Sequence, residues 1–148
     1  MLVKAIQLTH KEVMAILPHR EPMLLVDTVS HLESLKSIEA QYHIEPDLDI
    51  FRGHFPGEPV FPGVLSVECM AQAVDIMMMT APKYAGKTPL FLGINDVRFM
   101  KKIQPGDTLI TRAELVTERE EKAIAICNAV GYVGGEKAVS AEIVIAMR

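Results

Sequence analysis

The chain has 148 residues, of which 49% are hydrophobic, enough for one domain with a sizeable apolar core. We therefore expect a single domain over residues 1–148. The formal net charge of −4 gives no general attraction for nucleic acid or an anionic membrane, and no dense run of Lys and Arg supplies a local one.

The N-terminal segment, Met1–Leu8, is too short and too mixed in polarity to be a secretory signal. The two cysteines, Cys69 and Cys127, stand in apolar segments without the motif context of a nucleophile. Without a disulfide framework or an export signal, the chain is expected to be a cytoplasmic protein with buried thiols.

The first third of the chain predicts one short helix and two strands. Thr9 is followed three residues later by Glu12, the spacing of a capping box, so a helix is expected over Thr9–Leu17. Met23–Val26 is expected to begin an apolar strand, and the imperfect alternation over Ser34–Ile44 predicts a half-buried strand.

Three histidines of this part lack a catalytic or metal-binding context. His31 and His43 have no metal-ligand spacing to each other or to a cysteine, so no metal site is predicted. His19 lies in a turn between two prolines, and because no apolar helix brings a partner to it, we interpret it as structural.

The loop over Gly53–Gly63 surrounds one histidine with glycines and prolines. It repeats Phe-Pro-Gly at 55–57 and 61–63, and each Pro-Gly pair is typical of a type II turn. Two such turns predict a stiff loop that could hold His54 rigidly for catalysis. The alternative is that His54 only satisfies a turn.

The segment Val64–Met79 predicts a helix that is apolar nearly all round and therefore buried. Its polar residues Glu68, Gln72 and Asp75 follow i, i+4, i+7 spacing and share one face, while Ser66 points elsewhere. A carboxyl on such a helix is expected to have a raised pKa, which suits a general acid. The alternative is a narrow solvated stripe. These polar residues and the short length argue against a membrane span.

The rest of the chain predicts strands joined by short turns. Consecutive strands with short connections imply an antiparallel meander, so the expected fold class is α+β, a long central helix wrapped by a curved antiparallel sheet. The turns are expected at Pro105-Gly106 and, as a tight hairpin, at Gly134-Gly135. The expected strands cover Leu90–Ile103, Asp107–Glu118, Ala123–Tyr132 and Lys137–Met147.

Three blocks together resemble a known family. They are LPHREPMLLVD at 17–27, GHFPGEPVFPGVLSVECMAQ at 53–72 and RFMKKIQPGD at 98–107. Their order and spacing resemble the FabZ family, the (3R)-hydroxyacyl-acyl carrier protein dehydratases of the hot-dog fold. The middle block is the specific one, and the outer two would be weak alone.

The resemblance implies dehydration of a 3-hydroxyacyl thioester to a trans-2-enoyl thioester in fatty acid synthesis, without metal or organic cofactor. It implies that His54 removes the C2 proton and that Glu68 is the acid for the leaving hydroxyl. The backbone N–H of Gly63 is expected to bind the thioester carbonyl, and Gln72 to support the polar network.

The acyl chain is expected to lie against apolar side chains of the long helix, although those residues could equally be plain core. They are Leu65, Met70, Val74 and Met77–Met79. Acyl chain length is not predictable from the sequence.

The same resemblance implies an assembly. In the family, the histidine pairs with the glutamate of a neighbouring subunit, and dimers commonly assemble as a trimer of dimers. The chain departs from the family at Met100–Lys102, where a basic residue followed by proline is common. Arg98, Lys101 and Lys102 are candidates for meeting an acidic carrier protein, or are simply a solvated strand.

Three other functions stay open at this point. A bifunctional dehydratase/isomerase would act on the same substrate, but the dedicated enzymes of that type carry aspartate where this chain has Glu68. A hot-dog thioesterase would hydrolyse the thioester, yet would not require this histidine and glutamate. A non-catalytic acyl-thioester sensor would need an effector domain, for which 148 residues leave no room.

Overall fold

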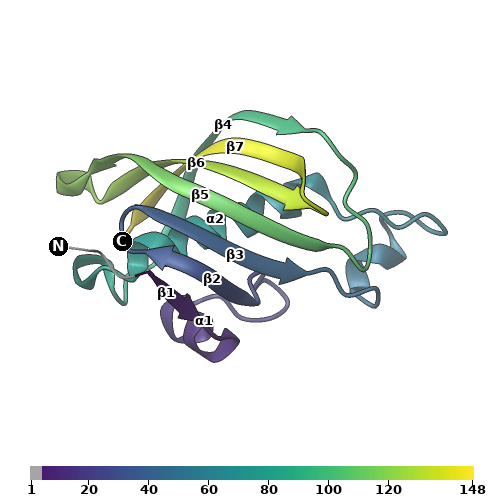
Figure 1. The fold of residues 1–148 in the computed structure, drawn as a ribbon, viewed down its shortest axis with the longest axis horizontal. Helices are drawn as coiled ribbons and strands as arrows, with labels where there is room; N and C mark the ends of the chain where they lie inside the picture. The colour runs from purple at the N-terminus through teal and green to yellow at the C-terminus, as the bar shows by residue number, and fades with distance from the viewer. Residues whose placement is uncertain (1–4) are drawn as a thin grey trace.

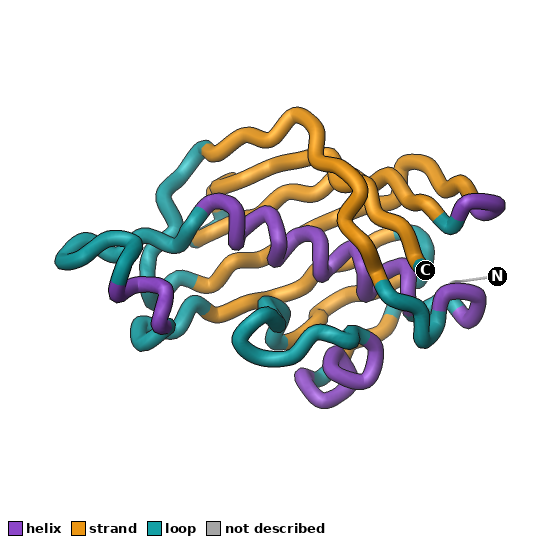
Figure 2. The backbone as a smooth tube through the Cα atoms, turned by 180° about the vertical axis from the view of Figure 1, so that it is seen from behind, coloured by secondary structure: helices purple, strands orange, loops and turns teal. Residues whose placement is uncertain are grey.

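The computed structural model describes residues 5–148, and at its centre the long helix α2 (Gly63–Met79) lies in the concave face of one curved antiparallel sheet (Figure 1). Figure 2 shows the same helix from behind, crossing the strands. The predicted α+β hot-dog architecture is confirmed. The other main elements are β1 (Ile6–Leu8), α1 (His10–Ile16), β2 (Thr28–Glu33), β3 (Ser37–His43), β4 (Pro89–Phe99), β5 (Thr108–Arg119), β6 (Ile124–Val133) and β7 (Glu136–Met147).

The strand order is β1-β2-β3-β5-β6-β7-β4, and all neighbours are antiparallel. The expected meander is therefore right for β5, β6 and β7 but wrong for β4, which pairs with β7 at the far edge instead of lying beside β5. β4 also ends at Phe99, four residues before the predicted end. Strand pairing is set by non-local contacts, which local sequence patterns do not contain.

Between β3 and β5 the chain leaves the sheet, forms the loop and α2, and returns to the sheet only as β4 at the far edge. β3 and β5 are paired along their length, from Ser37 opposite Glu114 to His43 opposite Thr108. Just beyond that ladder the Ile44 N–H donates to the Asp107 carbonyl at 2.9 Å, and the Gly106 N–H donates to the Ile44 carbonyl at 2.7 Å. These two hydrogen bonds bring the two ends of the segment 45–105 together, and we call this contact the neck.

α2 is buried because its side chains are apolar on nearly every face. Val74, Ile76, Met77 and Met78 are all 0% exposed and form part of the main core cluster. Truncating one of the larger ones to alanine would cost about 2–5 kcal/mol, the usual range for a buried aliphatic or methionine side chain. No helix within residues 5–148 is both long and apolar enough to cross a membrane.

The capping box predicted for the first helix is present. The Glu12 N–H donates to Thr9 Oγ1 at 3.3 Å, and the Thr9 N–H donates to Glu12 Oε1 at 3.0 Å. The strand predicted from Met23 is wrong, because residues 23–27 are irregular and β2 begins only at Thr28. The backbone of that segment bonds to a side chain of α2 instead of to a neighbouring strand.

The hairpin predicted at Gly134-Gly135 is confirmed. These residues connect β6 and β7 with φ angles of 58° and 79°, a left-handed pair that glycine adopts without steric cost. Gly106, in the other predicted turn, has φ 88°. Both predicted thiols, Cys69 and Cys127, are free and buried.

Candidate active site

The loop before α2 contains one of the two predicted type II turns. Gly57 has φ 76°, and the Glu58 N–H donates to the Phe55 carbonyl at 2.9 Å, which closes a turn with Pro56 and Gly57 at its centre. The turn expected at Pro62-Gly63 is wrong. The Pro62 carbonyl accepts from Leu65 and Ser66 at 3.0 and 3.2 Å, so this pair starts the helix instead.

His54 is held at both its backbone and its ring by one residue. Its Nδ1 lies 2.7 Å from the Val60 carbonyl oxygen, and the Val60 N–H donates to the His54 carbonyl at 2.9 Å. Because a carbonyl oxygen only accepts hydrogen bonds, Nδ1 carries the hydrogen. In the neutral ring Nε2 is then left with its lone pair, the state that a general base needs. The half-buried ring also stacks on Phe55 at a centroid distance of 4.1 Å.

Gly63 opens α2 and leaves a hydrogen-bond donor free. No hydrogen bond within residues 5–148 uses the N–H groups of Gly63 or Val64, as expected at a helix N-terminus. A Cβ at Gly63 would lie 2.8 Å from the ring of Phe99 on β4, so the close approach of helix and strand explains the glycine. Unpaired backbone N–H groups at a helix N-terminus, which carries a partial positive charge, can stabilise an oxygen that gains negative charge.

An open cavity of about 570 Å³ lies over this helix N-terminus, bordered by Gly63, Phe99 and Lys102 among others. Its wall combines the free donors of the helix with the apolar ring of Phe99 and with basic residues at the rim. A ligand with a polar head group and an apolar chain would match this combination of donors, apolar ring and basic residues.

Glu68 and Gln72 form a polar network with the irregular segment before β2. The Gln72 amide nitrogen donates to Glu68 Oε2 at 2.9 Å and to the Met23 carbonyl at 2.8 Å, and its oxygen accepts from the Leu25 N–H at 2.7 Å. Gln72 is 0% exposed, and hydrogen bonds hold both ends of its amide. The half-buried Glu68 is therefore held through Oε2, and no hydrogen bond within residues 5–148 uses its Oε1.

His19 belongs to the surroundings of Glu68, which the sequence did not indicate. Burial lowers the pKa of His19, while the negative charge of Glu68 opposes that shift. Its Nδ1 is enclosed without a hydrogen-bond partner within the described chain. No hydrogen bond or ion pair within residues 5–148 joins His19 to Glu68, so the structural interpretation of His19 stays a prediction.

The structure does not join the two predicted catalytic side chains within one chain. Among residues 5–148, no hydrogen bond or ion pair connects His54 with Glu68. His54 is bound to its own loop, and Glu68 to Gln72. Within one chain, the His54 ring and the Glu68 carboxyl are therefore held by separate sets of hydrogen bonds.

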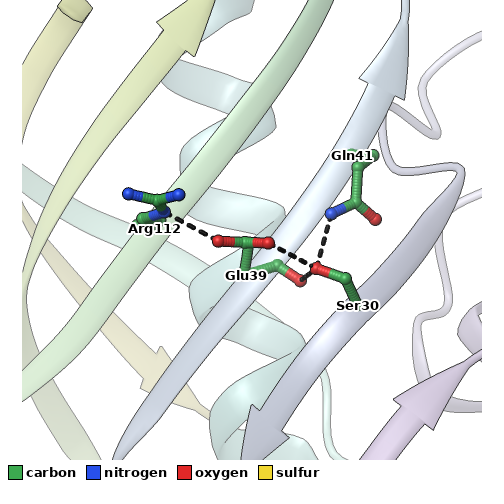
Figure 3. A network of polar contacts seen from close by, with 4 residues as sticks. All are labelled: Ser30, Glu39, Gln41 and Arg112. Atoms are coloured by element: carbon green, nitrogen blue, oxygen red, sulfur yellow. Dashed lines mark hydrogen bonds and ion pairs between the residues drawn. The ribbon is translucent and has the colours of Figure 1, made fainter. Parts of the chain in front are cut away.

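A second polar cluster lies on the opposite, convex face of the sheet (Figure 3). Ser30 Oγ donates to Glu39 Oε1 at 2.7 Å, Gln41 Nε2 donates to Ser30 Oγ at 2.6 Å, and Arg112 Nε donates to Glu39 Oε2 at 2.7 Å. The bonds from Ser30 and Arg112 lower the pKa of Glu39. This cluster ties β2, β3 and β5 together.

The fold and the two oriented groups define the chain as a hot-dog protein with a histidine loop and a helix carboxyl. Comparison with known proteins is specific: a FabA-like domain model matches residues 17–142, and the chain belongs to this family. A 3-hydroxyacyl-[acyl-carrier-protein] dehydratase FabZ from Oenococcus oeni is 42% identical over 141 residues, 95% of this chain and 100% of that protein. One from Clostridium tetani is 46% identical over 114 residues, 77% of this chain and 80% of that protein.

Among solved structures, the chain resembles the dehydratase heterocomplex ApeI:P from Xenorhabdus doucetiae. The TM-score is 0.77 at 20% sequence identity, covering 92% of this chain and 90% of that one. At this identity the likeness concerns the fold, and it agrees with the hot-dog architecture.

Proposed function

We propose that the chain is a 3-hydroxyacyl-[acyl carrier protein] dehydratase of fatty acid biosynthesis, a hydro-lyase that needs neither metal nor organic cofactor and works in the cytoplasm. Relatives bearing that name at about 40% identity over most of the chain support this function. The observation that carries the mechanism is the bond from His54 Nδ1 to the Val60 carbonyl, which leaves Nε2 as a base.

Two side chains, His54 and Glu68, transfer the protons of the reaction. His54 Nε2 takes the C2 proton, and the electron pair of that C–H bond forms the C2–C3 double bond while the C3–O bond breaks. Glu68 gives its proton to the departing oxygen, which leaves as water. The proton on His54 then returns to Glu68 through solvent, so both groups regain their starting states.

Charge that develops on the thioester oxygen meets the start of α2. The free N–H of Gly63 supplies the hydrogen bond, and the helix N-terminus adds its partial positive charge. Gln72 keeps the Glu68 carboxyl in place by holding one of its oxygens.

A complete site is assembled from two chains, the base from one and the acid from the other. Two observations support this: the lack of any bond between His54 and Glu68 within the described chain, and an apolar edge strand. β4 pairs on one side only, with β7, and most of its large apolar side chains are exposed. A second copy aligned along β4 would cover them, and dimers of this kind could pair further into a trimer of dimers.

The carrier protein is expected to dock beside the cavity over α2. Lys101 is paired with Glu136 at 3.5 Å, whereas no ion pair within residues 5–148 uses Arg98 or Lys102. Lys102, which borders the cavity, and the exposed Arg98 on β4 suit an acidic partner whose thioester enters the cavity.

The direct test is turnover of a 3-hydroxybutyryl thioester of the carrier protein to the trans-2-butenoyl thioester. The expected product is the trans-2 isomer, and His54→Ala and Glu68→Gln should each remove most of the activity while the protein stays folded. Formation of free thiol would show a thioesterase, and a cis-3 product from a longer substrate would show a bifunctional isomerase. Binding without turnover would indicate a sensor.

Mixing the two inactive variants tests the composite site. If His54 of one chain works with Glu68 of the other, a heterodimer of His54→Ala and Glu68→Gln has one intact site, and random pairing restores about a quarter of the wild-type activity. If each chain used its own His54 and Glu68, no mixture would regain activity. The mixture should be refolded together, so that the chains exchange.

A further inference from the structure

A second cavity, of about 400 Å³, lies at the end of β3, and none of the residues proposed for catalysis borders it. We call it the acidic cavity. One wall comes from the irregular segment before β2 and contributes Glu21 and Asp27, and the other comes from the residues just after the neck and contributes Glu45 and Asp47. The acidic cavity is more enclosed than the one over the start of α2, and small-molecule sites commonly have volumes of about 300–1,000 Å³.

The carboxylates of the acidic cavity have no basic partner within residues 5–148. No lysine or arginine borders the cavity, and no ion pair of the described chain uses its carboxylates. The Asp27 carboxylate is fixed, because the His43 N–H donates to its Oδ2 at 2.6 Å. Like charges around one cavity repel one another, and a bound cation would relieve that repulsion. Exposed carboxylates can be satisfied by water alone, so the buried groups of the cavity decide whether it is a site.

Tyr42 supplies a buried hydroxyl to the acidic cavity. This residue of β3 borders the cavity, is only 9% exposed, and has no hydrogen bond from its hydroxyl to another group of residues 5–148. Burial raises the pKa of Tyr42 to about 12, and neighbouring negative charges, including those of Asp27, Glu21 and Glu45, add to the shift. The hydroxyl therefore stays protonated beside the carboxylates. An enclosed polar group without a partner costs free energy, which a ligand with a hydrogen-bond donor would recover.

His10, the first residue of α1, also borders the acidic cavity. Its Nδ1 lies 2.8 Å from the Asp27 carbonyl oxygen, so Nδ1 carries the hydrogen, and Nε2 of the neutral ring has a lone pair. The carboxylates, the imidazole nitrogen and the phenol oxygen can all accept hydrogen bonds. A ligand that matches them is therefore a cation with several donors.

The arrangement of these acceptors favours an ammonium group over other cations. Within the described residues, no group of three or more His, Cys, Asp and Glu side chains is placed to hold a metal ion. A planar guanidinium suits a single carboxylate that it meets edge to edge, whereas an ammonium donates in three separate directions. The acceptors of the acidic cavity come from two walls and from Tyr42, so they suit donors that point in different directions.

We infer that the acidic cavity is a binding site for a linear aliphatic diamine or polyamine in its ammonium form. One ammonium group donates to the Tyr42 hydroxyl and to the carboxylates of Glu45 and Asp47, and a second meets the opposite acidic wall. This site is separate from the proposed dehydratase function and does not depend on it.

The test is isothermal titration calorimetry of the full chain with spermidine at low ionic strength and without substrate. The expected Kd is about 1 mM or tighter, and added salt should weaken it. Tyr42→Phe should weaken binding about tenfold, because it removes a hydrogen bond to a charged group. The same variant should keep its melting temperature without spermidine, since the hydroxyl has no partner there. Glu45→Gln combined with Asp47→Asn should weaken binding at least about tenfold.

The controls change the same chemical groups elsewhere. Tyr132→Phe removes a hydroxyl of β6 that lies outside the acidic cavity, and Glu114→Gln combined with Glu121→Gln removes two exposed carboxylates of β5 and the turn after it. Both controls should leave the Kd for spermidine unchanged.

Three results would overturn the inference. They are the absence of spermidine binding, an equal loss of affinity in the control variants, and binding of Mg²⁺ as tight as that of spermidine, which would indicate a surface that takes any cation. Dehydration of a 3-hydroxybutyryl thioester is measured separately on the same preparation. A chain that binds spermidine in this way but does not dehydrate the thioester would refute only the proposed function.

Discussion

Replacing Gln72 by methionine removes three hydrogen bonds at nearly constant volume. The Leu25 N–H, in a residue only 5% exposed, then loses its partner, and an enclosed donor without one costs about 1–3 kcal/mol. The Met23 carbonyl belongs to a residue 46% exposed, so water can replace the amide there at little cost. We therefore expect the free energy of unfolding to fall by about 2–3 kcal/mol, or the melting temperature by about 5–10 °C for a domain of this size.

The same substitution should also reduce catalysis, because Glu68 loses the amide that fixes one of its oxygens. We expect kcat/KM to fall by about 10- to 100-fold. Thermal unfolding at matched protein concentration and dehydration of a 3-hydroxybutyryl thioester measure the two effects. The control is Gln41→Met on the convex face, where the glutamine bonds only to Thr28 and Ser30 side chains, and where a change of about 0.5 kcal/mol or less is expected. Equal losses in the two variants would refute the argument from burial.

Three further changes test other parts of the structure. Asp75 has a raised pKa in the folded state, so its contribution to stability is full below the unfolded carboxyl pKa of about 4 and is lost as pH rises. In urea unfolding, Asp75→Asn should therefore stabilise the protein more at pH 8 than at pH 4. A difference that does not change with pH would contradict this. Gly63→Ala brings a Cβ to 2.8 Å from the Phe99 ring, so kcat/KM should fall about 100-fold. Adding Phe99→Leu should restore part of the activity. If it restores none, the Phe99 ring is not the obstacle. Because Glu39 has a lowered pKa in the folded state, Glu39→Gln should lower the free energy of unfolding by less than about 1 kcal/mol at pH 7, and this loss should vanish as pH falls through the folded pKa. If thermal unfolding shows the same loss across that pH range, the ionic bond to Arg112 is not its source.

Local features of the fold followed from local chemistry. The capping box at Thr9 and Glu12, the burial of α2 and the Gly134-Gly135 hairpin each depend on residues close together in the chain, and the structure confirms all three. The pairing of the strands could not be predicted from local patterns, because β4 is placed by its pairing with β7, some forty residues later in the sequence. The second Pro-Gly turn failed because the Pro62 carbonyl is used by the helix that begins there.

For the candidate site, the sequence indicated the spacing of polar residues on α2 but not the hydrogen bonds that hold them. The spacing of Glu68 and Gln72 indicated one helix face, and the structure adds the bond between them and the backbone segment that Gln72 binds. The influence of the Glu68 charge on the pKa of His19 could not be predicted, because the two residues are almost fifty positions apart in sequence. The roles of His54 and Gly63 stay predictions, supported by the bond to Val60 and by a free N–H.

The closed neck between β3 and β5 has an implication for how such a chain can change. Residues 45–105 contain His54, Gly63 and Glu68, and they leave and return at one point, where Ile44 bonds to Gly106 and Asp107. Most of the sheet ladder is formed by segments outside this excursion. Loop lengths and chemistry inside it can therefore vary at a modest entropic cost without shifting the register of those strands. The same segment also supplies β4 and α2, so a graft onto another sheet would carry the three residues proposed for catalysis together, provided that the pairing of β4 with β7 and the bonds from Gln72 to Met23 and Leu25 are kept.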